Sequence, residues 1–209
     1  MIKIVGFDWS GTLSDDRNPV YHSNQLLMEH YRLPPISYID LFQSTESNVV
    51  ESMQALGVTD SPGRIIANYE RFYRVAIEEE IHPVIYSDAE ESLRYLRDAG
   101  KYLFVLSSHP QEFLSNEVNG LGRFFSEIIG SCHNKYEALK RIIEQAKVRP
   151  EECMYIGDSI SDIRAGKNAG MRTIAITTGY HTREMLEETD YDYIVDSLSE
   201  LEDLPVFME

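Results

Sequence analysis

Asp8-Trp9-Ser10-Gly11-Thr12 is the stretch that decides the fold, because it places a carboxylate directly after the first apolar run of the chain. That run, residues 1–7, has the composition of a buried strand. A second apolar run, residues 153–156, ends in Gly157-Asp158-Ser159-Ile160-Ser161-Asp162. Acidic residues at the carboxyl ends of two strands of an open α/β sheet point into the crevice in which such folds bind ligands. Carboxylates with no basic residue beside them suit a hard divalent cation, so the two segments predict a metal site.

Composition and charge narrow the range of functions. The 209 residues are 43% hydrophobic, enough for the core of one α/β domain with a modest insertion. Lys and Arg number 19 against 35 Asp and Glu, and the net charge of −16 disfavours nucleic-acid or anionic-membrane partners. Met1 leads into a strand without a signal-peptide pattern, and no apolar run is long enough to span a bilayer. Cys132 and Cys153 both adjoin apolar runs, so we expect reduced core thiols in a cytoplasmic protein.

Short apolar runs alternate with helical segments along most of the chain. The alternation predicts right-handed βαβ units and a Rossmann-like, mostly parallel sheet with helices on both faces. A helix is expected to begin at Asp88, with Glu91 completing a capping box, and to end at Gly100. The further strands are expected at 102–106, 127–130, 153–156, 173–177 and 193–195.

Residues 14–86 interrupt this alternation with helical periodicity and no convincing strand. Ser61-Pro62 has the pattern of a helix start, a capping residue followed by proline in the first turn. We therefore predict an all-helical cap domain at 14–86, inserted into a core domain formed by 1–13 and 87–209. Its hinges are expected near 13–16 and 84–87.

Four segments, in order, resemble the motifs of the haloacid dehalogenase-like superfamily, whose members are mostly phosphatases. The first is Asp8 to Thr12, the second is Ser107 at the end of a strand, and the third is Lys135 at the start of a helix. The fourth is Gly157-Asp158 with Asp162 four residues after Asp158. The order, the spacing and the later Thr178-Gly179-Tyr180 are similar to phosphoglycolate-phosphatase-type members, which carry a helical cap.

The resemblance implies a role for each motif residue. Asp8 would be the nucleophile that forms an aspartyl-phosphate, with Lys135 and Ser107 as the other catalytic residues. Mg²⁺ would be held by Asp8, Asp158 and the backbone carbonyl of Ser10, with Asp162 in the outer shell. The substrate phosphate would be bound by Thr12, Ser107, Ser108 and Lys135. The partner expected is thus a small phosphorylated molecule.

Ser10 departs from the family pattern, because these phosphatases carry there a second Asp that protonates the leaving oxygen and then activates water. A serine hydroxyl does not exchange protons near neutral pH as a carboxyl does, and such help is typically worth roughly 10²–10⁴ in rate. His22 and His109 could carry protons instead, but we predict surface or capping roles for both. Trp9 is predicted to pack under the cap.

There are three alternatives to a phosphatase with weakened acid–base catalysis, and the residues disfavour the first two. Dehalogenases replace the second Asp, but their fourth motif lacks the Gly-Asp present at 157–158. Phosphonoacetaldehyde hydrolase has Ala at the position of Ser10 but uses a cap Lys, and this chain has no Lys between Lys3 and Lys101. The third alternative is a catalytically poor module that binds a phosphorylated ligand.

Overall fold

The computed structural model describes residues 1–44 and 48–208, and the chain divides into two compact units. The core unit comprises Met1–Asp15 and Ile85–Glu209, and the helical unit comprises Asp16–Val84. Each unit has an apolar core of its own.

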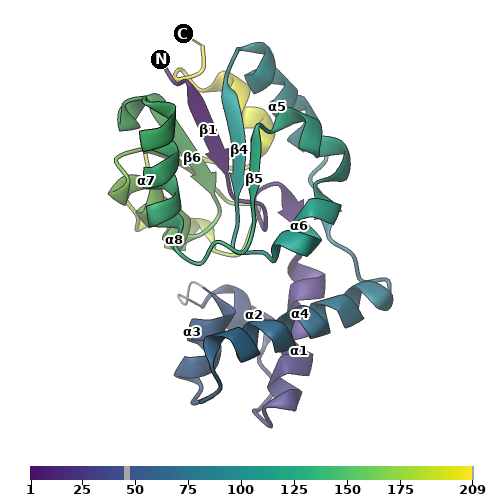
Figure 1. Ribbon diagram of the computed structural model, residues 1–209. Helices are drawn as coiled ribbons and strands as arrows, with labels where there is room; N and C mark the ends of the chain where they lie inside the picture. Colours follow the sequence, from purple (N-terminus) through teal and green to yellow (C-terminus); the bar gives the residue numbers. More distant parts are fainter. Residues whose placement is uncertain (45–47, 209) are drawn as a thin grey trace. The chain divides into compact units, whose positions relative to one another are not determined.

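A parallel sheet of six strands forms the centre of the core unit in the described part of the chain (Figure 1). The strand order is β5-β4-β1-β6-β7-β8, and every neighbouring pair is parallel. The chain moves outward from β1 to β4 and β5 and then returns to β6 on the other side of β1, which makes the β1–β6 pair the topological switch point. The strands are β1 (Ile4–Phe7), β4 (Tyr102–Leu106), β5 (Glu127–Ile129), β6 (Cys153–Gly157), β7 (Arg172–Ile176) and β8 (Tyr193–Val195).

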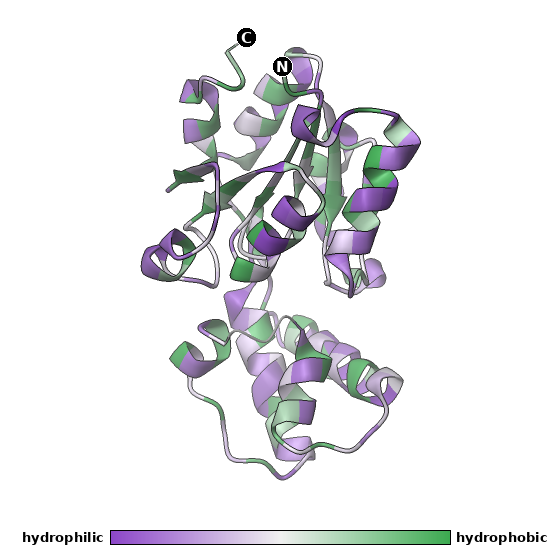
Figure 2. Cartoon of the chain, turned by 90° about the vertical axis from the view of Figure 1, so that its left-hand side faces the viewer, coloured by the Kyte–Doolittle hydropathy of each residue, from purple (hydrophilic) through white to green (hydrophobic). Residues whose placement is uncertain are grey.

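Alternating side chains of the central strands build a core on each face of the sheet. On β1, Val5 and Phe7 belong to one apolar cluster, whereas Ile4 belongs to the other. On β6, Met154 and Tyr155 divide between the clusters in the same way. Because both faces are covered, the central strands β1 and β6 are apolar and buried along their whole length, and most of the sheet is coloured as hydrophobic in Figure 2.

Helices cover both faces of this sheet, which confirms the predicted fold class. The first cluster includes residues of α5 and α6, and the second includes residues of α7 and α8. Asp88 precedes α5 as predicted, but its side chain makes no capping bond and instead accepts a hydrogen bond from the Ser199 backbone at 3.0 Å. The helices are α5 (Ala89–Asp98), α6 (Gln111–Glu117), α7 (Lys135–Ala146), α8 (Ile160–Asn168) and α9 (Arg183–Glu187), with short 3-10 turns η1 (Asn119–Phe124), η2 (Pro150–Glu152) and η3 (Leu198–Asp203).

The helical unit is held together by apolar side chains that its helices share. Leu27 and Met28 of α1 pack with Met53 of α3 and Ile65 of α4. Helix α4 begins at Pro62 after Ser61, as the sequence predicts. The helices are α1 (Arg17–His30), α2 (Tyr38–Phe42), α3 (Val49–Ala55) and α4 (Pro62–Glu78). Among the described residues, no helix combines the length and apolar character needed to cross a membrane.

Two short strands were not predicted from the sequence. β2 (Ser14–Asp15) and β3 (Val84–Ile85) pair in a two-stranded sheet at the boundaries of the helical unit. The expectation of no strand in 14–86 is therefore wrong at its ends. A strand of two residues is too short for an alternating pattern to show in the sequence.

Candidate functional site

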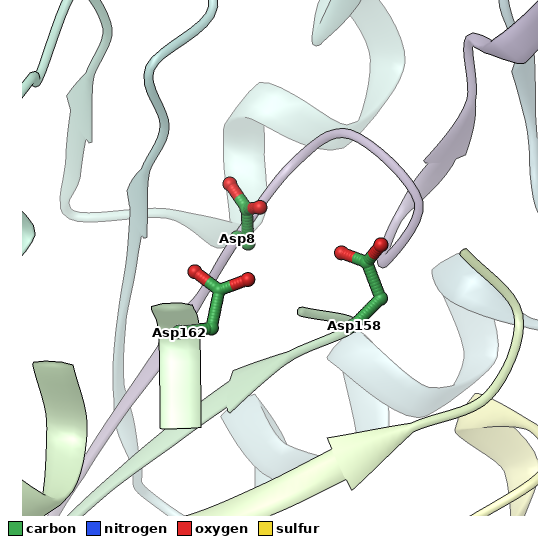
Figure 3. A group of neighbouring side chains, drawn as sticks. All are labelled: Asp8, Asp158 and Asp162. Atoms are coloured by element: carbon green, nitrogen blue, oxygen red, sulfur yellow. The ribbon is translucent and has the colours of Figure 1, made fainter. Parts of the chain in front are cut away.

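Three buried carboxylates converge at the carboxyl ends of β1 and β6. Asp8 follows β1, Asp158 follows β6, and Asp162 lies in the first turn of α8 (Figure 3). The backbone N–H of Asp8 donates to the carbonyl of Ile156 at 2.9 Å, which fixes the relative position of the two strand ends. One oxygen from each of the three carboxylates lies within 4.8 Å of the others. The three residues are between 0% and 7% exposed, so this cluster is a concentration of negative charge away from solvent.

Both oxygens of the Asp158 carboxylate accept hydrogen bonds. Thr12 Oγ1 donates to Oδ1 at 3.1 Å, and the backbone N–H of Tyr180 donates to Oδ2 at 2.7 Å. A Cβ atom at Gly11 or Gly179 would lie 2.3 or 2.0 Å from Oδ2, so only glycine fits beside this oxygen. The Thr12 hydroxyl thus holds Asp158, and a contact between Thr12 and the substrate phosphate stays a prediction.

Lys135 is the cation that partners this cluster. Its Nζ lies 3.0 Å from Asp8 Oδ1 and 2.6 Å from Asp162 Oδ1. Asp162 Oδ2 accepts the Ser159 backbone N–H at 3.2 Å, which completes a capping box at the start of α8. Both oxygens of Asp162 therefore have donors, which favours an indirect role for this carboxylate toward a cation.

Burial and mutual repulsion shift the protonation equilibria of the cluster. Burial raises the pKa of the Asp8 carboxyl to about 6, with Lys135 opposing the rise and Asp162 adding to it. Burial, then Asp162 and Asp8, raise the pKa of Asp158 well above its usual range. Burial acts to lower the pKa of Lys135, but Asp162 and Asp8 together raise it well above the usual lysine value. One lysine does not balance three carboxylates, and a further positive charge would fit this site.

The remaining predicted site residues lie on neighbouring loops. Ser107 follows β4, is 1% exposed, and accepts the His109 backbone N–H on its Oγ at 3.1 Å. That bond uses an acceptor lone pair, so the hydroxyl proton can still be donated to a ligand. Ser108 is exposed, and Ser10 is half-buried and forms a bridge with Ser14 in the turn after β1.

The side chains of Trp9 and His109 both contact Glu117 in the core unit, and the sequence did not single out Glu117. The His109 side chain is only 3% exposed and lies 3.0 Å from Glu117, so the prediction of a surface position is wrong for His109. Trp9 is 0% exposed, and its indole N–H also bonds to Glu117. His22 is partly exposed in the helical unit, where it pairs with Glu79.

One family model matches most of the chain, and several known proteins are similar to it. A family model described as haloacid dehalogenase-like hydrolase matches residues 5–176. The chain is 27% identical to a phosphoglycolate phosphatase of Vibrio parahaemolyticus, over 96% of this chain and 94% of that protein. It is 29% identical to a phosphoglycolate phosphatase of Vibrio cholerae, over 96% and 95% of the two chains. A solved haloacid dehalogenase-like hydrolase from Streptococcus pneumoniae has a TM-score of 0.83 at 19% identity, with 97% of each chain covered.

Proposed function

Because the chain belongs to the haloacid dehalogenase-like hydrolase family, we propose that it is a Mg²⁺-dependent phosphatase acting on a small phosphorylated metabolite. The observation that carries the proposal is the convergence of Asp8, Asp158 and Asp162 around Lys135. The relatives named phosphoglycolate phosphatase support a phosphate ester as substrate. Membership of the family confirms the resemblance found in the sequence.

Asp8 is the proposed nucleophile. A carboxylate oxygen of Asp8 attacks phosphorus, the P–O bond to the leaving alcohol breaks, and the alcohol oxygen takes a proton from solvent. Water then attacks the phosphorus of the aspartyl-phosphate, releases inorganic phosphate and gives its proton to solvent. Lys135 offsets charge on Asp8 and the phosphoryl oxygens, and the Ser107 hydroxyl donates to one of those oxygens. Ser108, exposed on the same loop, is a further proposed phosphate contact.

Asp8 and Asp158 are the proposed side-chain ligands of Mg²⁺, with the backbone carbonyl of Ser10 as a third. The fit is supported by the donor set, since carboxylate and carbonyl oxygens are the ligands that Mg²⁺ prefers. Burial, the largest cause of the upward pKa shifts of Asp8 and Asp158, disfavours their ionised forms, and a bound cation would offset this effect. Bound there, Mg²⁺ supplies charge that offsets the phosphoryl oxygens in the transition state.

Mg²⁺ is expected to stabilise the protein, and more strongly near neutral pH than in acid. The pKa of Asp8 rises from 3.8 to about 6. Protonation of Asp8 therefore stabilises the folded protein fully below pH 3.8, and this stabilisation is lost as the pH rises through about 6. The cation replaces that lost stability, because it binds the ionised form. We expect a gain of roughly 3 kcal/mol when free Mg²⁺ is a hundred times Kd. Thermal unfolding at about pH 7.5 and about pH 5 measures both effects.

The matched variant for this measurement is Asp158→Asn, which keeps the shape of the side chain and removes one ligand charge. It should lose most of the Mg²⁺-dependent rise in melting temperature at both pH values. An undiminished rise in this variant would place the cation elsewhere.

Turnover on a panel of phosphate esters tests the proposed activity. Phosphoglycolate, sugar phosphates and nitrophenyl phosphate would be assayed with Mg²⁺ and with a chelator. The proposal expects release of inorganic phosphate that depends on Mg²⁺. Binding of phosphorylated ligands without turnover on any of them would favour the rival function, a binding module with little catalysis.

We further propose that the helical unit acts as the cap that selects the substrate. This proposal is supported by the division of the chain, in which Asp16–Val84 forms a separate compact unit with its own apolar core. Limited proteolysis should cut near 13–16 and 84–87 more readily than within α1 or α4, and vanadate should protect these links. Cuts confined to other loops would contradict a mobile cap.

A further inference from the structure

Glu117, at the end of α6, accepts hydrogen bonds from two side chains in the interior of the core unit. Its Oε2 accepts the Trp9 indole N–H at 2.9 Å, and its Oε1 lies 3.0 Å from His109 Nε2. The side chains of Glu117 and His109 are 10% and 3% exposed, and Trp9 is 0% exposed. When Glu117 is ionised it only accepts hydrogen bonds, and the Nε2 atom of His109 then carries the proton in this pair.

Trp9 connects this carboxylate to Asp8. The backbone N–H of Trp9 donates to Asp8 Oδ1 at 2.7 Å. The carbonyl of Trp9 accepts the backbone N–H groups of Leu13 at 2.9 Å and Ser14 at 3.1 Å. The residue whose indole is held by Glu117 therefore also orients the Asp8 carboxylate and closes the turn that follows it.

His109 connects the same carboxylate to Ser107. The backbone N–H of His109 donates to Ser107 Oγ at 3.1 Å. The carbonyl of His109 accepts the backbone N–H of Ser131 at 2.7 Å, which ties the loop after β4 to the end of β5. The Glu117 carboxyl group thus contacts two loops that carry site residues. It meets one loop through Trp9, which is adjacent to Asp8, and the other through His109, two residues after Ser107.

We propose that Glu117 is a positioning residue that keeps Asp8 and Ser107 in the positions required for attack on phosphorus. This inference depends on the proposed function for the roles of those two residues. The hydrogen bonds described for Glu117 go to Trp9 and His109 rather than to Asp8 or Ser107. Its effect passes through the indole of Trp9 on one side and the imidazole of His109 on the other.

The central experiment compares Glu117→Ala with Glu117→Gln. In the Ala variant the indole N–H of Trp9 loses its acceptor, and the turn after β1 is held less firmly. We expect kcat to fall by about 10²-fold, because misplacing a reacting group mainly affects the chemical step. The change in KM should be much smaller. The Gln side chain can accept from Trp9 through its oxygen and donate from its amide to His109 Nε2, with the histidine proton moving to Nδ1. Most of kcat should therefore return in Glu117→Gln. The control is Glu144→Ala, at an exposed position on α7, which should match the wild type.

Trp9 is the only tryptophan of the chain, so its fluorescence reports on this contact without an assay. The emission of the Glu117→Ala variant should shift from that of the wild type, and the Gln variant should restore it. Addition of vanadate with Mg²⁺ should change the emission of the wild type, since it binds beside Asp8. The Ala variant should respond less.

A double-mutant cycle separates positioning from general loss of stability. Trp9→Phe removes the indole donor and keeps an aromatic ring. If Glu117 acts through Trp9, the loss of kcat in the double variant should be clearly less than the product of the two single losses. Independent effects that multiply would contradict the inference, as would a Glu117→Ala enzyme that is less stable but turns over at the wild-type kcat.

Failure of the inference can be told from failure of the proposed function. If the wild type turns over and Glu117→Ala keeps its kcat, only the inference is overturned. If the wild type releases no phosphate from any ester, the proposed function fails, and the Trp9 emission then decides the role of Glu117. Identical emission and an identical vanadate response in the wild type and Glu117→Ala would overturn the positioning role of Glu117.

Discussion

Replacement of Asp8 by Asn is expected to abolish phosphate release. The amide keeps the size of the side chain and an acceptor for the Trp9 N–H, but it is not a nucleophile toward phosphorus. The expected loss of kcat is on the order of 10⁵–10⁶-fold, the scale seen when a hydrolase loses its nucleophile. Steady-state assays on nitrophenyl phosphate measure it, because this substrate requires little protonation of its leaving oxygen.

The matched control for this variant is Asp98→Asn, at an exposed position at the end of α5. It should keep the wild-type rate. Turnover by Asp8→Asn at the wild-type rate would mean that the nucleophile is a different residue.

Replacement of Ser10 by Asp is expected to raise turnover of esters with poor leaving groups by about 10²-fold, on the usual scale of acid–base help. The new carboxyl would stand two residues after Asp8, where the resemblance to the family implies a proton donor. Substrates with good leaving groups should gain less, because their departing oxygen needs less protonation. The measurement is kcat/KM across a series of phosphate esters of increasing leaving-group pKa, and the wild type should depend on that pKa more steeply than Ser10→Asp.

Ser10→Asn is the matched control, since Asn has the size of Asp but no titratable group. It should not reproduce the gain. Two results would contradict this account of Ser10. Efficient hydrolysis of an alkyl phosphate by the wild type would mean that another group supplies the proton. A Ser10→Asp variant that binds Mg²⁺ but gains nothing would mean that the site has diverged at more than one residue.

The sheet could be predicted from the sequence because its strands are covered on both faces. Such strands are continuous apolar runs, and Ile4–Phe7 and Cys153–Gly157 both fall within or beside the runs that were identified. The pair β2–β3 was missed because its strands are two residues long. The side chain of Asp88 was assigned to a helix cap from local spacing, but its partner is the backbone of Ser199, 111 residues away.

The positions of Asp8 and Asp158 at adjacent strand ends followed from the motif order and from the rule for open α/β sheets. The contacts that hold Asp158 could not be predicted in the same way. The donor from Tyr180 is a backbone N–H, which every residue except proline has, so the sequence does not single it out. Glu117 was missed because it meets Trp9 across 108 residues of chain.

The measurement that tests the central claim most directly is a search for phosphate covalently attached to Asp8. Because Ser10 has no titratable carboxyl to activate water, hydrolysis of the aspartyl-phosphate should be slow relative to its formation from a substrate with a good leaving group. The enzyme would be mixed with nitrophenyl phosphate and Mg²⁺, quenched in acid during turnover, and digested for mass spectrometry. The account predicts one phosphoryl group on the peptide that contains Asp8, removed by hydroxylamine and absent from Asp8→Asn. Phosphate release without such an adduct, or with the phosphoryl group on another residue, would contradict it.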